Sequence, residues 1–142
     1  TISACDGTEI EFASQSSAVN AAGEAEGTIV KFGDDSTVPG KVYTFYSGTW
    51  TLVDADGEDT TRGLLGMALG SNSSTNGMLV YGVGYVAVDP GDAGKPLYIS
   101  TTAGDLTENQ PTDPSDFVRV VGYCLADQKI FFSPSQDYID LA

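Results

Sequence analysis

The chain has 142 residues, with 20 acidic side chains, 6 basic side chains and no histidine, so its formal net charge is −14. Without histidine, Ser–His–Asp and Cys–His catalysis and His-ligated zinc are excluded. Six dispersed cations exclude a nucleic-acid groove, because affinity for phosphates comes from clustered Lys and Arg. They also disfavour binding to an anionic membrane surface. We therefore expect neither nucleic acid nor membrane as a partner, and no apolar run approaches the roughly 20 residues of a membrane-spanning helix.

From about residue 27 onward, short apolar or alternating runs are separated by turn residues. Gly allows positive φ, Pro fixes φ, and Asp and Asn bond to their own backbone, so segments rich in these residues predict turns. Regular short strands of this kind are typical of a sandwich or barrel. We predict an all-β fold, a compact β-barrel or sandwich over residues 28–142, preceded by a loosely structured N-terminal arm over residues 1–27. The expected strands are residues 28–32, 42–46, 49–53, 64–69, 78–81, 85–88, 97–100, 117–125 and 129–132.

A repeat underlies this pattern. The pair Gly40-Lys41 is followed by a glycine, by Trp50-Thr51 and by the run LLGMALG, and Gly94-Lys95 is followed by a glycine, by Leu106-Thr107 and by VVGYCLA. The offset is 54 residues at the Gly-Lys pair and 56 residues from the next glycine onward. We interpret residues 40–82 and 94–133 as two copies of one strand unit, each unable to bury its apolar face alone. The copies are expected to pair about a pseudo-two-fold axis into a closed or nearly closed β-structure.

The acidic run Asp54-Ala55-Asp56-Gly57-Glu58-Asp59 resembles part of a calcium loop, with alternating oxygen donors and a glycine for a sharp turn. The twelfth position from Asp54 is Leu65 instead of a bidentate Glu, and no flanking helices are expected. Asp54, Asp56 and Asp59 are therefore only weak metal candidates, and a solvated hairpin tip is the favoured interpretation. No nucleophile elbow or phosphate-binding loop is present, so we expect no enzyme activity and no cofactor.

The two cysteines leave two interpretations open. Cys124 lies in the apolar run VRVVGYCLA, which favours a small buried thiol, and Cys5 lies near the amino terminus. A disulfide between Cys5 and Cys124 would close a long loop and tie down the terminal segment.

The aromatic side chains divide into two groups. Those in strand runs are predicted to lie in the core: Phe45, Trp50, Tyr98, Phe117 and Phe131. The tyrosines predicted to alternate to an outer face, as a sugar- or protein-contacting patch, are Tyr43, Tyr46, Tyr81, Tyr85 and Tyr123.

The block from Gly94 to the carboxyl end contains a series of short motifs. In order they are Gly-Lys-Pro-Leu-Tyr at 94–98, a Ser-Thr-Thr-Ala-Gly turn with Leu-Thr at 100–107, a Pro-rich loop at 111–114, Val-Arg-Val-Val-Gly-Tyr at 118–123 and an aromatic-Pro segment at 131–134. This series resembles a strand module of tailed-phage structural proteins, both tail-fibre-like and head-decoration-like proteins of aquatic viruses. Residues 48–51, together with LLGMALG and GMLVYG, resemble the same module, so the resemblance covers roughly residues 27–142.

The resemblance implies a non-enzymatic virion structural protein on the surface of an extracellular particle. It would act as a capsid decoration (cement) protein or a fibre module, assembling through the arm and a β-face. The expected partners are further copies of the chain, as a homotrimer, and virion proteins such as a major capsid protein. One alternative is a carbohydrate- or receptor-binding module, with two or three coplanar exposed aromatics beside a shallow acidic groove that holds a host glycan. The other is an extracellular filament subunit whose arm donates a strand to the next copy.

Overall fold

The computed structural model describes residues 19–141, and this part of the chain contains strands, turns and loops but no helix, as the sequence predicts. No helix in this part could therefore cross a membrane. Residues 1–18, most of the predicted arm, lie outside the described residues. The strands are β1 (Ala25–Val30), β2 (Val42–Tyr46), β3 (Thr49–Leu52), β4 (Leu64–Ala68), β5 (Met78–Tyr85), β6 (Pro96–Ile99), β7 (Leu106–Thr107), β8 (Phe117–Val118), β9 (Val120–Ala126), β10 (Lys129–Phe132) and β11 (Ile139–Asp140).

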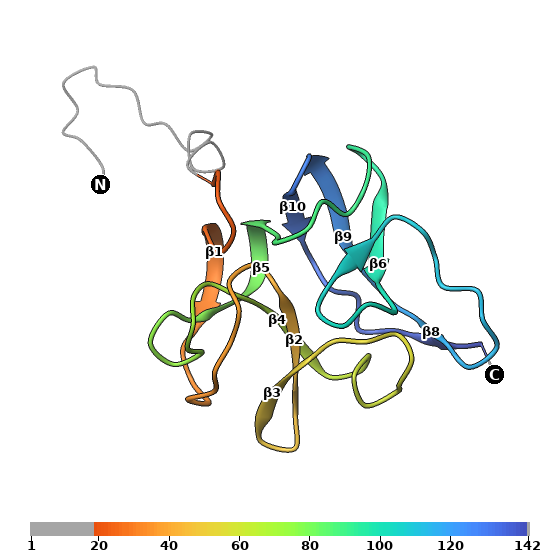
Figure 1. The fold of residues 1–142 in the computed structure, drawn as a ribbon, viewed down its shortest axis with the longest axis horizontal. Helices are drawn as coiled ribbons and strands as arrows, with labels where there is room; N and C mark the ends of the chain where they lie inside the picture. The colour runs from red at the N-terminus through yellow and green to blue at the C-terminus, as the bar shows by residue number, and fades with distance from the viewer. Residues whose placement is uncertain (1–18, 142) are drawn as a thin grey trace.

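One antiparallel sheet in the order β3-β2-β4-β5-β10-β9-β6-β7 dominates the fold, and β1 pairs with β5 beside this path. Figure 1 shows that the sheet curls, so that it forms a half-barrel in place of the closed barrel that was one of the expectations. Backbone hydrogen bonds also link the loop that follows β3 with the loop between β6 and β7. The Gly104 amide donates to the Val53 carbonyl (2.7 Å), and the Ala55 amide donates to the Ser100 carbonyl (3.0 Å). A small separate sheet pairs β8 with β11.

Each of the two sequence repeats forms one half of the sheet, and its strands follow the same order from the outer edge to the centre. The first repeat supplies β3-β2-β4-β5 and the second supplies β7-β6-β9-β10, and the two meet where β5 pairs with β10. The pairing register repeats as well. Tyr43 lies opposite Gly66 in the first half, and Leu97 lies opposite Gly122 in the second, so each glycine occupies the same place in its ladder. The repeat detected in the sequence is therefore a repeat of strand pairing.

Although the strand pairing repeats, equivalent residues of the two halves are buried on opposite faces of the sheet. Tyr43 packs with Trp50 in a small cluster on one face of the sheet, whereas its counterpart Leu97 belongs to the main core on the other face. The register of β5 against β1 shifts between Leu79 and Tyr81, which marks a β-bulge between the two halves. A one-residue shift moves every following side chain to the opposite face. The bulge therefore reverses the alternation along β5, so that Leu79 faces the main core while Tyr81, two residues later, is exposed.

The main core fills the inside of the curl and draws on both halves. Its members are Val42, Val53, Ala55, Leu65, Met67, Leu79, Val86, Leu97, Ile99, Leu106, Val121, Cys124, Ile130 and Phe132. A smaller cluster on the outside of the first half contains Tyr43, Trp50, Ala68 and Met78, with Val30, Phe32 and Phe45 packed against it. Among the aromatics predicted as core, Trp50 is buried, whereas Phe45, Tyr98, Phe117 and Phe131 are half-buried.

Several strand boundaries differ from the predictions. The sequence predicts a break at Gly82-Val83-Gly84, but β5 runs through it. Position 84 faces the main core and has room only for glycine, since an added Cβ would lie 2.0 Å from the Met67 Cε atom. The short strands β7 and β11 are not predicted, and β1 begins at Ala25, inside the range predicted as arm.

Candidate functional site

A row of apolar and aromatic side chains lies on the outer face of β5, β9 and β10. We call Tyr81, Val83, Tyr123 and Phe131 the outer strip. Phe131 is the cross-strand partner of both Val83 and Tyr123, so these three share a face. The Tyr81 and Phe131 rings meet edge to face, with centroids 5.4 Å apart. Tyr81 is 53% exposed and Tyr123 is 49% exposed, and Leu125, two residues beyond Tyr123, extends the exposed surface.

The other predicted surface tyrosines do not join the outer strip. Tyr43 is only 5% exposed, and its hydroxyl accepts a hydrogen bond from the Val38 amide (2.8 Å), so its assignment to a surface patch is wrong. Burial raises the pKa of this phenol. Alternation along β2 points Tyr43 toward the small cluster that Trp50 completes. Tyr46 is exposed at the end of β2, and Tyr85 is half-buried at the end of β5. The strip consequently combines Tyr81 with Tyr123, and β4 separates it from β2.

The acidic run 54–59 forms a self-bonded loop. The Asp54 carboxylate accepts a hydrogen bond from the Asp56 amide (3.0 Å), which is the turn that short acidic side chains favour. Asp59 pairs with Arg62 (2.7 Å). The three weak metal candidates therefore do not converge, and no group of three acidic or thiol side chains among residues 19–141 is arranged to hold a metal ion. Instead, Asp56 lies near Asp116, a residue that the sequence analysis did not single out.

Asp56 gives a pH-dependent prediction. The Asp54 charge, with smaller contributions from burial and Asp116, raises the pKa of Asp56 above its usual value near 3.8. The folded state therefore holds this proton more readily than the unfolded state. The resulting stabilisation is present at low pH and is lost as pH rises through the folded pKa. We expect Asp56→Asn to have a slightly higher Tm than the parent protein at pH 7. The difference in Tm should disappear below about pH 4. Thermal unfolding followed by circular dichroism measures both. Asp137→Asn removes the same net charge elsewhere, and an equal rise in that variant would contradict the local explanation.

Cys124 is a buried free thiol. It is 1% exposed, and its Sγ donates to the Gly91 and Asp127 carbonyls, both at 3.4 Å. Burial raises the pKa of this thiol, so its nucleophilic thiolate is disfavoured. Its proposed disulfide partner, Cys5, lies outside the described residues.

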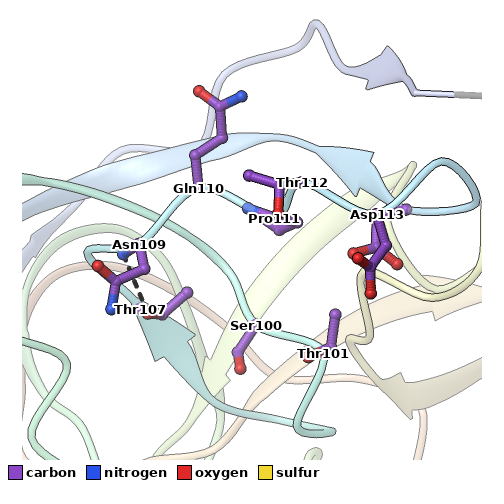
Figure 2. A pocket seen from close by; sticks show the side chains of 9 residues that line it. Ser100, Thr101, Thr107, Asn109, Gln110, Pro111, Thr112 and Asp113 are labelled. Carbon is purple, nitrogen blue, oxygen red and sulfur yellow. Dashed lines mark hydrogen bonds between the residues drawn. The ribbon is translucent and has the colours of Figure 1, made fainter.

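Two polar cavities lie side by side at the β6–β7 end of the sheet. One of about 270 Å³ is drawn in Figure 2, where the backbone amide of Asn109 donates a hydrogen bond to the Thr107 hydroxyl (3.1 Å). The other has a volume of about 460 Å³, and Ser100, Thr107 and Asn109 line both. Asp, Asn, Ser and Thr side chains predominate, and no aromatic side chain of the described chain lines either cavity. These cavities therefore lack the stacking platform that a glycan-binding groove was expected to have.

Comparison of the chain with protein-family models and with curated proteins finds no match to either.

Proposed function

We propose that this protein is a non-enzymatic structural protein that assembles with further copies of itself through the outer strip. The observation that carries the proposal is the exposure of two tyrosines beside Phe131 at the centre of the sheet. Tyr81 and Tyr123 expose about half of their surface while their backbones are fixed in a ladder of paired strands. Large aromatic side chains held on a rigid surface are the usual centres of binding energy in protein interfaces.

The location of the outer strip fits a closed assembly. It lies on β5, β9 and β10, where the two halves of the sheet join, so a partner docked there touches both halves. Closed symmetric oligomers are the common outcome for identical chains. Among them we propose a homotrimer, because that is the state expected of the fibre and decoration modules that the sequence resembles.

The charge of the chain makes the assembly sensitive to salt. Copies that each carry a net charge of −14 repel one another, and this repulsion opposes an interface built from apolar contacts. The Debye length falls from about 30 Å at 0.01 M salt to about 8 Å at 0.15 M. Added salt should therefore strengthen the association, which is the opposite of what an interface held by ion pairs would show.

We further propose that the assembled protein belongs to a virion surface, as a capsid decoration protein or a fibre module. The support is the resemblance of residues 94–134 to a strand module of tailed-phage structural proteins, together with the all-β fold. A strongly acidic surface suits such a particle, because it keeps copies soluble and repels nucleic acid. The glycan-binding alternative has less support, since Tyr81 and Phe131 are nearly perpendicular (80°) rather than coplanar.

The experiment is sedimentation velocity on the double variant Tyr81→Ser/Tyr123→Ser. Each truncated aromatic hot spot costs at least about 1 kcal/mol, so the dissociation constant for self-association should rise by about 30-fold. Tyr46→Ser is the matched control, because Tyr46 is also an exposed tyrosine but lies on β2, outside the strip. Equal association of the double variant and the parent, or an equal loss in Tyr46→Ser, would refute the interface.

A further inference from the structure

A cavity of about 250 Å³ opens where the two halves of the sheet separate. Two strands pair with the same edge of β5. β4 pairs with it at Met78 and Leu79, and β10 pairs with it from Gly82 to Tyr85. Val80 lies between these two pairings. We call this cavity the notch; the residues that line it include Leu64, Leu65, Val80, Arg119, Pro134 and Gln136.

Arg119 is the one charged side chain that lines the notch. It is 5% exposed, and all of its hydrogen bonds go to neutral carbonyls. Nε donates to Ser135 (2.7 Å), and Nη1 donates to Thr61 (2.7 Å) and Gly63 (2.9 Å). None of the ion pairs formed within residues 19–141 includes this guanidinium. The notch therefore contains a buried positive charge without a compensating anion. In agreement with this, burial lowers the pKa of Arg119 from its usual value.

The remaining nitrogen of Arg119 is free to bind. A guanidinium has five N–H groups, and the three hydrogen bonds use only those of Nε and Nη1. Every fully buried side-chain nitrogen or oxygen in the described part of the chain has a hydrogen-bond partner. Since Nη2 has none there, it keeps contact with solvent, and the notch is the cavity that Arg119 lines. Nη2 thus offers two donors to a molecule that enters the notch.

We propose that the notch binds a carboxylate group carried on a short apolar stem, with Nη2 of Arg119 donating to one carboxylate oxygen. A charge-assisted hydrogen bond of this kind is stronger than a neutral one, and the buried cation gains the anion that it lacks. Leu64, Leu65, Val80 and Pro134 provide apolar walls for the stem. A phosphate fits less well, because its oxygens require several donors and Arg119 has only one nitrogen left to donate.

The size of the notch sets the size of the ligand. Its volume lies just below the roughly 300 Å³ at which drug-sized pockets begin, so a short stem with a carboxylate fits within it. Such a group can be an acidic side chain from a second copy or a free aliphatic carboxylate, since both present the same chemistry. The net charge of −14 repels anions at long range, but at 0.15 M salt this repulsion is screened beyond about 8 Å.

The test is a titration of the ¹⁵N-labelled full chain with butyrate, followed by chemical shifts. We expect saturable shifts at Leu65, at Val80 and at Arg119 Nε, with Kd in the low millimolar range. Butyramide has nearly the same shape without the charge, and it should bind at least about tenfold more weakly, because it forms only a neutral hydrogen bond with the cation. Equal binding of butyrate and butyramide, or butyrate shifts that do not include Arg119, would overturn the proposal.

Variants provide a second test. Arg119→Met removes the cation and should abolish the difference between butyrate and butyramide, but the loss of three carbonyl contacts can prevent folding. Val80→Phe fills the notch and leaves the Arg119 hydrogen bonds in place, so it should lose butyrate binding by more than about tenfold while keeping its fold. Val88→Phe, at an exposed site outside the notch, is the control. Unchanged butyrate binding in Val80→Phe would contradict the assignment.

A further experiment identifies the source of the carboxylate. If saturating butyrate weakens self-association, the natural occupant is a side chain of a second copy, and if association is unchanged, it is a free carboxylate. The notch does not overlap the outer strip, so carboxylate binding and strip-dependent assembly can succeed or fail independently.

Discussion

Replacement of Gly122 by alanine is expected to disrupt the pairing of β9 with β10 and to lower the free energy of unfolding by about 2–6 kcal/mol. Gly122 has φ of +150°, and an added Cβ would lie 1.9 Å from the Phe131 carbonyl oxygen. Strain at such a conformation costs about 1–3 kcal/mol, and forcing apart two packed strands costs about as much again. Because small domains are stable by only about 5–15 kcal/mol, this loss is measurable by urea unfolding and can leave the chain unfolded.

Gly94→Ala separates the two causes. Gly94 also has positive φ (+87°), but nothing lies within 4 Å of an added Cβ. This control should lose only the cost of backbone strain, about 1 kcal/mol or slightly more. If the two variants were equally stable, the close approach of Phe131 to Gly122 would not be what requires glycine there.

Replacement of Trp50 by alanine is expected to lower the free energy of unfolding by about 3–5 kcal/mol. Trp50 is 3% exposed, and its ring packs against Phe32 (centroids 5.3 Å apart) and Phe45 (5.2 Å). Alanine would leave a cavity among the other members of the small cluster and remove both of these ring contacts. The ring also covers Gly66, where an added Cβ would lie 3.1 Å from it.

Trp50→Phe is the matched variant for this cluster. It keeps an aromatic ring and removes the hydrogen bond from Nε1 to the Phe32 carbonyl (3.2 Å), which contributes about 1 kcal/mol. Urea unfolding followed by far-ultraviolet circular dichroism compares both variants with the parent. A loss of less than about 1 kcal/mol in Trp50→Ala would show that the small cluster does not stabilise the first half of the sheet.

Most strands and the twofold repetition of the strand unit could be predicted, because both are marked by local signals in the sequence. Turn residues mark where each strand ends, and the glycines at positions 66 and 122 retain the spacing of the repeat. Both occupy the same place in their ladders. They do so for different reasons, however: Gly66 makes room for the Trp50 ring, whereas Gly122 adopts positive φ against Phe131.

The relation between the faces of the two halves could not be predicted, because it depends on register shifts such as the bulge in β5. Strict alternation cannot show that a single extra residue reverses the faces between the two halves. Tyr43 is a separate case: its side chain does lie on the outer face, but Trp50, Phe32 and Phe45 cover that face, whereas Tyr81 and Tyr123 are exposed as expected.

Arg119 was missed for a different reason. A lone arginine within the apolar run FVRVVGYC signals a buried guanidinium, but only the fold shows that its acceptors come from residues 61–63 and from Ser135. A cation in the middle of a strand-forming run is the feature that would have marked it.

The measurement that tests the central proposal most directly is sedimentation equilibrium of the unmodified chain at 0.01 M and 0.15 M salt. Assembly through the outer strip predicts a closed oligomer, with a trimer as the stoichiometry, and a lower dissociation constant at the higher salt concentration. A monomer at both salt concentrations, at every protein concentration tested, would contradict it.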